Sequence, residues 1–225
     1  MMKLFIVPTP IGNLEDITLR ALRVLKEADF VLCEDTRTTK NLLRHYEIEK
    51  NCLAYHIHNE HQQLANMIRQ IQQSETVALT SDAGTPGISD PGFLLVRECI
   101  KENIPVECLP GATALIPALV NSGLPSDCFK FYGFIPHKKG KETLLKQMAV
   151  AHETSIFYES PYRLLKTLEM MRPIFGNDRP IAISRELSKM FEENFRGTIE
   201  EAVAHFAAKP VKGEIVVIVG EKTDE

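Results

Sequence analysis

The residues best suited to chemistry lie in one irregular segment, residues 81–92, which reads Ser-Asp-Ala-Gly-Thr-Pro-Gly-Ile-Ser-Asp-Pro-Gly. Its glycines let backbone groups approach a ligand closely, and Asp82 and Asp90 can accept hydrogen bonds from an ammonium group or from hydroxyls. An irregular stretch of this length inside a compact domain is more often functional than a plain connection. The segment lacks the Gly-Lys-Ser/Thr ending of a P-loop, and no Gly-x-Gly-x-x-Gly follows Val7, so a kinase or a nicotinamide-dependent dehydrogenase is disfavoured.

Three further segments place turn formers or charged residues directly after apolar runs: residues 7–16, 34–37 and 110–113. In an open α/β sheet, ligands bind outside the carboxyl ends of the strands. We therefore expect all four segments to gather at one sheet edge and to form a single site. For residues 34–37 the alternative is a helix start, in which Asp35 caps the helix and pairs with Arg37, and both interpretations stay open.

The candidate catalytic residues are Glu34, Arg37 and His58. A hydroxyl is a poor nucleophile until its proton is accepted, and a carboxylate or an imidazole at the sheet edge can accept that proton. The guanidinium of Arg37 can hold a phosphate through two parallel hydrogen bonds. Which residue is the general base stays open at this point.

The histidines and cysteines do not indicate a metal site. The spacing His56-x-His58-x-x-His61 fits no standard metal site, so we expect no metal. The five cysteines form no Cys-x-x-Cys pair, and their odd number is typical of buried thiols in a reducing compartment. The N-terminal apolar run ends at Pro8, too soon for a signal peptide. No run approaches the roughly 18 apolar residues of a membrane helix, so we expect a cytoplasmic protein.

A basic patch, residues 137–142, is the candidate contact to RNA. The formal net charge of the chain is −4, so a nucleic-acid partner requires a local cluster of cations. Lys138, Lys139 and Lys141 supply such a cluster and would contact RNA phosphates. The alternative is a solvated loop without a partner.

The elements that position these residues alternate between strand and helix. In the first half, apolar runs predict strands at 3–7, 30–33, 52–57, 76–80 and 105–109. Helical spacing of apolar residues predicts helices between them, at 17–28, 36–45, 60–73, 93–102 and 112–121. This alternation predicts an α/β fold with a mostly parallel sheet that is covered on both faces.

Turn formers at 122–127 predict a domain boundary, which divides the chain into residues 1–124 and 125–225. The second half is again α/β. Its apolar runs predict strands at 129–134, 154–158, 180–184, 192–196 and 215–219, with helices at 143–151, 162–171 and 199–208. The closing strand is apolar throughout, which is typical of a central strand.

Taken together and in order along nearly the whole chain, these motifs resemble the tetrapyrrole-methylase superfamily, and within it the branch that methylates small-subunit ribosomal RNA. The motifs that carry the resemblance are residues 7–16, 34–37, 58–60, 81–92, 110–113, 133–136, 157–161 and 213–217. Any one of them is weak, but the set is highly specific. Many members continue into a small C-terminal helical region, whereas this sequence stops at Glu225, which puts one RNA-contacting piece in doubt but not the methyl-transfer core.

The resemblance implies two α/β domains with S-adenosylmethionine in the cleft between them, and a homodimer. It implies 2′-O-methylation of a cytidine ribose in the decoding region of small-subunit ribosomal RNA. The residues that it assigns to the cofactor are Pro10, Ser81, Asp82, Ala83, Gly84, Ile88, Ser89, Asp90, Pro110, Gly111, Ala112, Thr113, Tyr158, Glu159, Gly213 and Glu214. The alternatives are a C-methylase that acts on a tetrapyrrole, and a non-enzymatic module that senses the cofactor.

Overall fold

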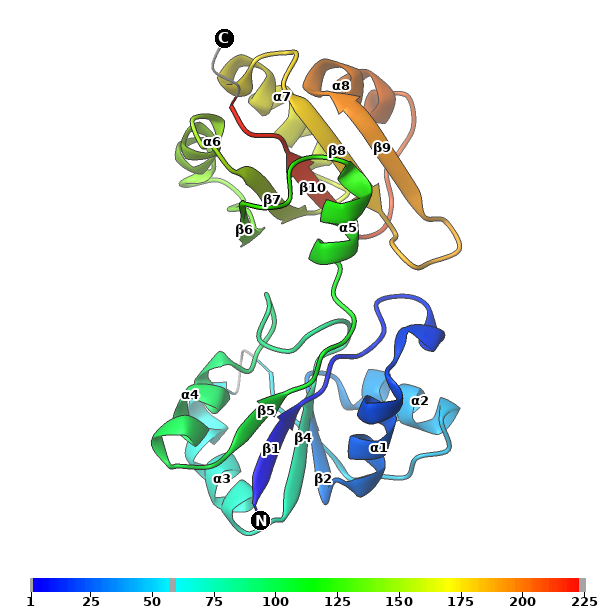
Figure 1. Cartoon of the computed structure of the whole chain (residues 1–225), viewed down its shortest axis with the longest axis vertical. Helices are drawn as coiled ribbons and strands as arrows, with labels where there is room; N and C mark the ends of the chain where they lie inside the picture. The colour runs from blue at the N-terminus through cyan, green and yellow to red at the C-terminus, as the bar shows by residue number, and fades with distance from the viewer. Residues whose placement is uncertain (1, 57–59, 223–225) are drawn as a thin grey trace. The chain divides into compact units, whose positions relative to one another are not determined.

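The chain forms two compact units, residues 1–113 and 114–225 (Figure 1). The computed structural model describes residues 2–56 and 60–222, without the side chains of residues 60–62. Each unit is an α/β domain with its own sheet and its own hydrophobic core, which confirms the predicted fold class.

Helix α5 (Leu115–Ser122) is the first element of the second unit, although the expected boundary at 124/125 placed it in the first domain. It packs against strands of the second sheet. The turn formers that suggested a linker instead end this helix, because Gly123 adopts a left-handed backbone with φ 72°. A left-handed glycine is a common helix ending. The same residue types end helices and begin linkers, so the sequence pattern did not separate the two.

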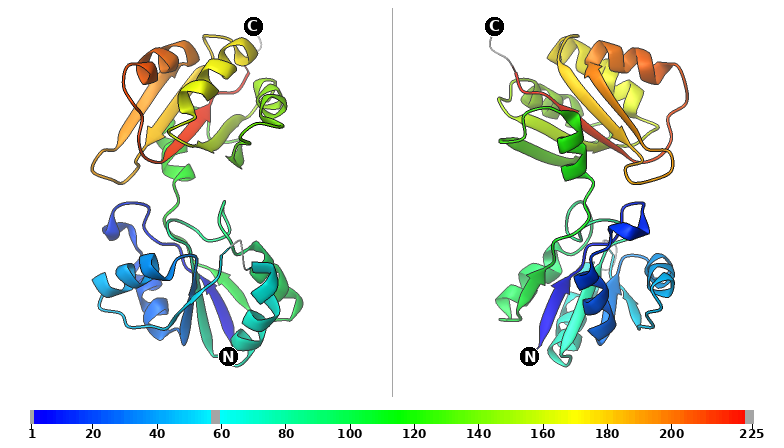
Figure 2. Two further views of the ribbon diagram at one scale, coloured as in Figure 1. Left: turned by 180° about the vertical axis from the view of Figure 1, so that it is seen from behind. Right: turned by 45° about the vertical axis from the view of Figure 1, so that its right-hand side comes forward.

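The first unit is a five-stranded parallel sheet with helices on both faces (Figure 2). The strand order is β3-β2-β4-β1-β5, and neighbouring strands run parallel. Apolar side chains of α1 and α2 pack on one face of the sheet, and those of α3 and α4 pack on the other. The elements are β1 (Lys3–Ile6), the short 3-10 helix η1 (Leu14–Asp16), α1 (Leu19–Glu27), β2 (Phe30–Cys33), α2 (Thr36–His45), β3 (Cys52–Ala54), α3 (Glu60–Gln72), β4 (Thr76–Thr80), α4 (Phe93–Lys101) and β5 (Val106–Cys108).

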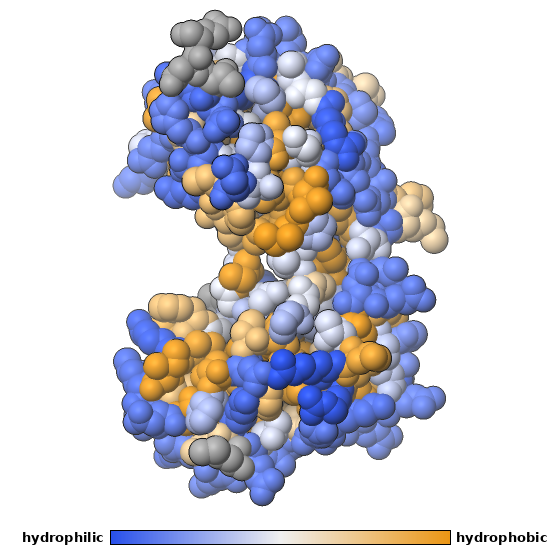
Figure 3. All heavy atoms as spheres, viewed as in Figure 1, coloured by the Kyte–Doolittle hydropathy of each residue, from blue (hydrophilic) through white to orange (hydrophobic). Residues whose placement is uncertain are grey.

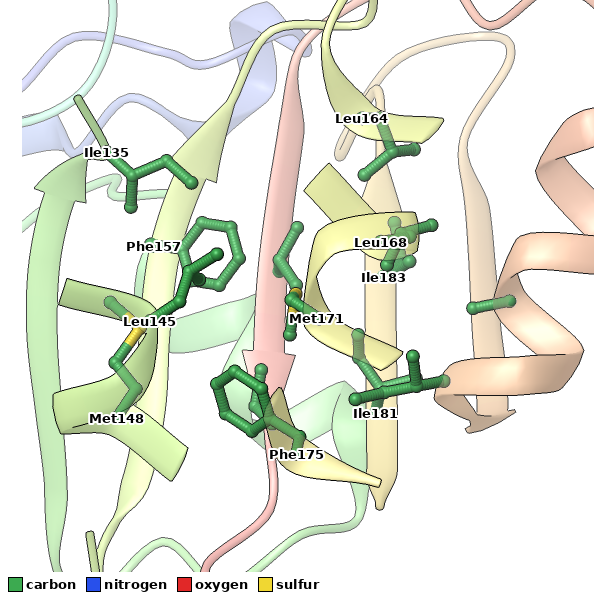
Figure 4. Packing of buried hydrophobic residues seen from close by; sticks show 14 of the residues in the cluster. Ile135, Leu145, Met148, Phe157, Leu164, Leu168, Met171, Phe175, Ile181 and Ile183 are labelled. Atoms are coloured by element: carbon green, nitrogen blue, oxygen red, sulfur yellow. The ribbon is translucent and has the colours of Figure 1, made fainter. Parts of the chain in front are cut away.

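The second unit is a mixed five-stranded sheet in the order β6-β7-β10-β8-β9. Strand β6 runs parallel to β7, and the other neighbours are antiparallel. Strand β10 is buried along its whole length and is central, as its continuous apolar sequence predicted. Helices α6, α7 and α8 cover one face, where Leu145, Phe157 and Met171 pack together (Figure 4). The elements after α5 are β6 (Phe129–Phe134), α6 (Lys141–Ala149), β7 (Thr154–Glu159), α7 (Leu164–Phe175), β8 (Pro180–Arg185), β9 (Glu193–Thr198), α8 (Ile199–Ala207) and β10 (Ile215–Val219).

Candidate functional site

Four loops follow the carboxyl ends of β1, β2, β4 and β5, which are neighbours in the first sheet. Loop 81–92, which follows β4, is tied directly to the loops after β1 and β5. Thr9 and Gly84 exchange two backbone hydrogen bonds of 2.9 Å each. The hydroxyl of Thr85 donates to the carbonyl oxygen of Ala112 at 3.0 Å. The structure therefore brings these predicted segments together at one sheet edge.

The backbone of loop 81–92 bends through left-handed conformations that favour glycine, with φ 79° at Gly84 and 85° at Gly87. A Cβ atom built at Gly87 would meet no atom within 4 Å, so one side of the backbone is open there. A Cβ atom at Gly92 would lie 3.1 Å from the side chain of Leu79. Gly92 therefore allows close packing on β4, whereas Gly87 leaves room for a ligand.

The first-unit residues expected at the cofactor divide into a buried base and an accessible surface. Pro10, Ser81 and Gly84 are buried. The hydroxyl of Ser81 donates to the carbonyl oxygens of Ala83 and Gly84 at 3.3 Å, so it holds the loop in shape. The expected cofactor residues that are exposed or half-exposed are Asp82, Ala83, Ile88, Ser89, Asp90, Pro110, Gly111, Ala112 and Thr113.

Two carboxylates interact at this edge, one after β2 and one after β4. Burial and then the charge of Asp82 raise the pKa of Glu34, while a hydrogen bond from the Asp82 backbone and the nearby His56 oppose the rise. Burial also raises the pKa of Asp82, and a hydrogen bond of 3.1 Å from the Asp35 N–H to its carboxylate opposes that rise. A carboxylate with a raised pKa is a stronger base. Glu34 is thus suited to accept a proton.

Asp35 begins helix α2 as its cap. Its carboxylate accepts the backbone N–H of Arg37 at 2.7 Å and pairs with the Arg37 guanidinium at 2.7 Å. The side-chain hydrogen bond from Arg37 is the main reason that the pKa of Asp35 falls to about 2. The helix-cap interpretation is therefore confirmed for Asp35. The Arg37 side chain is still 89% exposed and is accessible to an anionic ligand, whereas His58 lies outside the described residues.

The prediction that Lys141 contacts RNA is corrected by its burial. Its side chain is 5% exposed, and its Nζ lies 3.1 Å from the fully buried Glu159 carboxylate. The guanidinium of Arg163 pairs with the same carboxylate at 2.7 Å, and the hydroxyl of Thr167 donates to it at 2.6 Å. Helix α6 begins at Lys141, two residues before the predicted start at 143, and this places the side chain inside the unit. Lys138 and Lys139 stay exposed.

The sequence pattern did not identify the partners of Glu159. Arg163 and Thr167 follow it at intervals of four residues, which is the spacing of one face of a helix. That spacing was the available signal, but nothing in the sequence placed Lys141 beside them. We name this group the buried cluster: Lys141, Glu159, Arg163 and Thr167.

Comparison with known proteins assigns the chain to a family. A family model of the tetrapyrrole (corrin/porphyrin) methylases matches residues 3–203. The chain is 51% identical over 224 residues to ribosomal RNA small subunit methyltransferase I of Hydrogenobaculum sp. (strain Y04AAS1), a match that covers 98% of this chain and 96% of that protein. This chain belongs to the ribosomal RNA small subunit methyltransferase I family. It is also 46% identical over 222 residues to the Thermotoga maritima member, with 99% and 100% of the two chains covered.

The fold of this methyltransferase family member is shared with a solved tetrapyrrole methylase. Uroporphyrin-III C-methyltransferase from Thermus thermophilus, complexed with S-adenosylhomocysteine, matches with a TM-score of 0.66 at 21% identity. The match covers 97% of each chain. At this identity the likeness shows the fold alone.

The second-unit residues that the resemblance assigned to the cofactor lie in different surroundings. Tyr158 is half-buried, whereas Glu159 belongs to the buried cluster and is 1% exposed. Gly213 has φ 91°, and a Cβ atom there would collide with the side chain of Glu186. The carboxylate of Glu214 is exposed and pairs with Lys189 at 3.0 Å. Glu159 is therefore held by its protein partners, and Tyr158 is the residue of this family motif that stays accessible.

The described part of the chain contains no group of three or more histidine, cysteine or acidic residues arranged to hold a metal ion. Cys33, Cys52 and Cys99 are buried, and all five cysteines are free thiols. Among the helices of the described residues, none is long and apolar enough to cross a membrane.

Proposed function

We propose that this chain transfers a methyl group from S-adenosylmethionine to the ribose 2′-hydroxyl of a cytidine in the decoding region of small-subunit ribosomal RNA. Relatives at 51% and 46% identity, matched over nearly their whole lengths, are named as methyltransferases of that RNA. The chain is accordingly an S-adenosylmethionine-dependent methyltransferase of ribosomal RNA. The proposal of ribose 2′-O-methylation rests on one observation: hydrogen bonds join the loops after β1, β2, β4 and β5 at one sheet edge. These bonds place the ligand-binding groups of loop 81–92 beside Glu34, which can accept a proton.

The accessible edge of the first unit suits this cofactor. S-adenosylmethionine supplies a methyl group already activated on a sulfonium, so the protein's main task is orientation. Asp82 and Asp90 would accept hydrogen bonds from its ammonium group and hydroxyls, and the open backbone at Gly87 admits a close ligand. The turn at 110–113 would line the same site. Because the sulfonium is already a good leaving group, we propose that the reaction requires no metal.

Glu34 is the residue that we propose accepts the proton of the ribose hydroxyl. Its position after β2 places it beside Asp82, and its raised pKa makes it a stronger base than an ordinary glutamate. Arg37 would hold a phosphate next to the reacting ribose, because its exposed guanidinium can donate two parallel hydrogen bonds. Lys138 and Lys139 would add phosphate contacts that do not depend on base sequence.

We further propose that the protein works as a homodimer in the cytoplasm. The family resemblance supports the dimer, and the location of ribosomal subunits supports the compartment. Sedimentation velocity of the purified protein measures the assembly directly, and a single species at 25.4 kDa would contradict the dimer.

The experiment that tests the function supplies labelled S-adenosylmethionine with one of two acceptors. The first is small ribosomal subunits that lack 2′-O-methylation, and the second is a tetrapyrrole. We expect label on the ribosomal RNA alone, and mass spectrometry of nuclease fragments should place it on the ribose of a cytidine. Label on the tetrapyrrole alone would favour the C-methylase alternative. Cofactor binding without transfer to either acceptor would favour a sensing module.

A further inference from the structure

A cluster of aromatic rings lies at the β6 edge of the second sheet. Phe131 and Phe134 of β6 both contact Tyr158 of β7 edge to face, with ring centroids 5.0 and 5.3 Å apart. Phe134 is 61% exposed, and Phe129 at the start of β6 is 39% exposed. Figure 3 shows hydrophobic surface over the part of this unit that carries β6, β7 and α5. Exposed apolar surface of this kind marks interaction sites. We name Phe131, Phe134 and Tyr158 the aromatic cluster.

A β-bulge builds this cluster. Phe131 pairs with Ile156 and Phe134 pairs with Tyr158, so three steps along β6 match two steps along β7. In a regular strand, residues three apart point to opposite faces of the sheet. The extra residue, with Gly133 at φ 63°, instead puts both phenylalanine rings on the Tyr158 face. The strand is therefore shaped to present two rings side by side.

Unpaired cations follow the aromatic cluster closely in the chain. Lys138 and Lys139 are exposed, and neither makes an ion pair with another side chain of the described residues. A chain segment spans at most about 3.6 Å per residue, so the backbone of Lys138 lies within about 14 Å of that of Phe134. This spacing of ring and cation suits a strand of nucleotides, whose bases stack while its phosphates need positive charge.

A second exposed apolar group of the same unit lacks this unpaired charge. The hairpin between β8 and β9 presents Met190 at 90% exposure and Phe191 at 69% exposure. The adjacent cation, Lys189, is already paired with Glu186 at 2.9 Å and with Glu214 at 3.0 Å. A polyanion would therefore gain little there. Of these two surfaces, charge complementarity favours the aromatic cluster for a nucleic acid.

We propose that the exposed ring of Phe134, held in place by its contact with Tyr158, stacks on an unpaired base of the target RNA, while Lys138 and Lys139 bind the phosphates beside it. The proposal rests on the proposed function and names the part of the substrate that this surface takes. The base must be unpaired, because rings can stack only on a base face that is free of its neighbours. Such stacking tolerates any base, so it would position the strand without selecting its sequence.

The test measures binding of fluorescently labelled oligocytidylate over a series of salt concentrations. The variants are Phe134→Ala, the double variant Lys138→Ala/Lys139→Ala, and Phe191→Ala as the matched control. We expect Phe134→Ala to weaken binding about tenfold with an unchanged salt dependence, because stacking is not electrostatic. The double lysine variant should flatten the salt dependence. Phe191→Ala should bind as the unsubstituted protein does.

Calorimetry with S-adenosylhomocysteine and sedimentation velocity complete the test, and both should give the same result for every variant. The proposal is overturned if the unsubstituted protein does not bind the oligonucleotide, or if Phe134→Ala binds it normally. It is equally overturned if Phe134→Ala loses cofactor affinity alone, or if it changes the oligomeric state, because the cluster would then serve the cofactor or a second copy.

Methylation of subunits by the unsubstituted protein is measured in parallel. Failure there contradicts the proposed function, whereas normal methylation with normal binding by Phe134→Ala contradicts this inference alone.

Discussion

The buried cluster of the second unit and a charged cluster at the sheet edge of the first unit differ in how many cations pair with their carboxylates. In the buried cluster, Glu159 is matched by two cations and a hydroxyl inside the second unit. In the edge cluster of the first unit, which comprises Glu34, Asp35, Arg37 and Asp82, three carboxylates share one guanidinium, and it pairs with Asp35.

The difference separates a structural role from a chemical one. A buried carboxylate with two cationic partners is held in one place. Glu34 is different, because burial and then the charge of Asp82 raise its pKa, so it can exchange a proton. Substitutions in the buried cluster should therefore cost stability, whereas substitution of Glu34 in the edge cluster should cost rate.

The largest effect is expected from Lys141→Ala. Without Lys141, the buried Glu159 carboxylate keeps Arg163 but loses one of its two cationic partners, and breaking a buried ion pair costs up to about 3–5 kcal/mol of unfolding free energy. Urea unfolding followed by circular dichroism measures the change. Lys138→Ala is the matched control, because an exposed lysine without a partner should change stability by about 0.5 kcal/mol or less. Equal stability of the two variants would contradict the structural role of the buried cluster.

The second-largest effect is expected from Glu34→Gln, which should lower the rate of methyl transfer. Loss of the proton acceptor should slow single-turnover methyl transfer roughly 10²-fold, at the lower end of the range for a general base. The melting temperature and the cofactor affinity should stay near those of the unsubstituted protein. Glu75→Gln, at the opposite end of β4, is the control and should keep the normal rate. If Glu34→Gln transfers methyl groups at the normal rate, the proton acceptor lies elsewhere at this edge.

The pH dependence of the methyl-transfer rate tests whether Asp82 raises the pKa of Glu34. Glu34 accepts a proton only when it is ionised, so the rate should fall as the pH drops through its raised pKa. Asp82→Asn removes a negative charge that helps to raise this pKa, so the acid limb of the profile should move to lower pH. The measurement is single-turnover rate against pH at saturating cofactor, because Asp82 is also a proposed cofactor ligand. An acid limb that does not move would show that Asp82 does not tune Glu34.

The smallest effect is expected from Arg37→Ala. The pKa of Asp35 should rise from about 2 toward its ordinary value of 3.8, because its main hydrogen bond is lost. A depressed pKa stabilises the folded protein above the unfolded-state value, and this contribution disappears as the pH falls through the folded-state value. The melting temperatures of variant and unsubstituted protein should thus differ slightly at neutral pH and converge near pH 2. An NMR titration that finds Asp35 unchanged would contradict the pairing.

Much of the fold followed from local pattern. The alternation of apolar runs and helical spacing predicted the strands and helices, because each period reports directly which face of an element is buried. The continuous apolar sequence of β10 predicted its central place. Boundaries were less secure, as with α7, which continues through Pro173 to Phe175 beyond the predicted end at 171.

The loops at the sheet edge were also predictable, since parallel strands all end at the same edge. What the loops contact there was not. The hydrogen bonds that join Thr9 to Gly84 and Asp35 to Asp82 link residues more than forty positions apart in the chain. Only the packing of β2, β4 and β1 side by side creates these contacts.

The sequence by itself determined the α/β organisation and the family, and it named the segments that we propose carry the chemistry, because periodicity and motif order are local properties of the chain. The tertiary structure decided which charges are available. Lys138 and Lys141 lie in one basic patch of the sequence, yet one is exposed and the other is buried against Glu159. The bulge at Gly133 decided that Phe131 and Phe134 share a face. Both outcomes depend on where a neighbouring strand lies, and a lysine or a phenylalanine carries no information about that neighbour until the chain has folded.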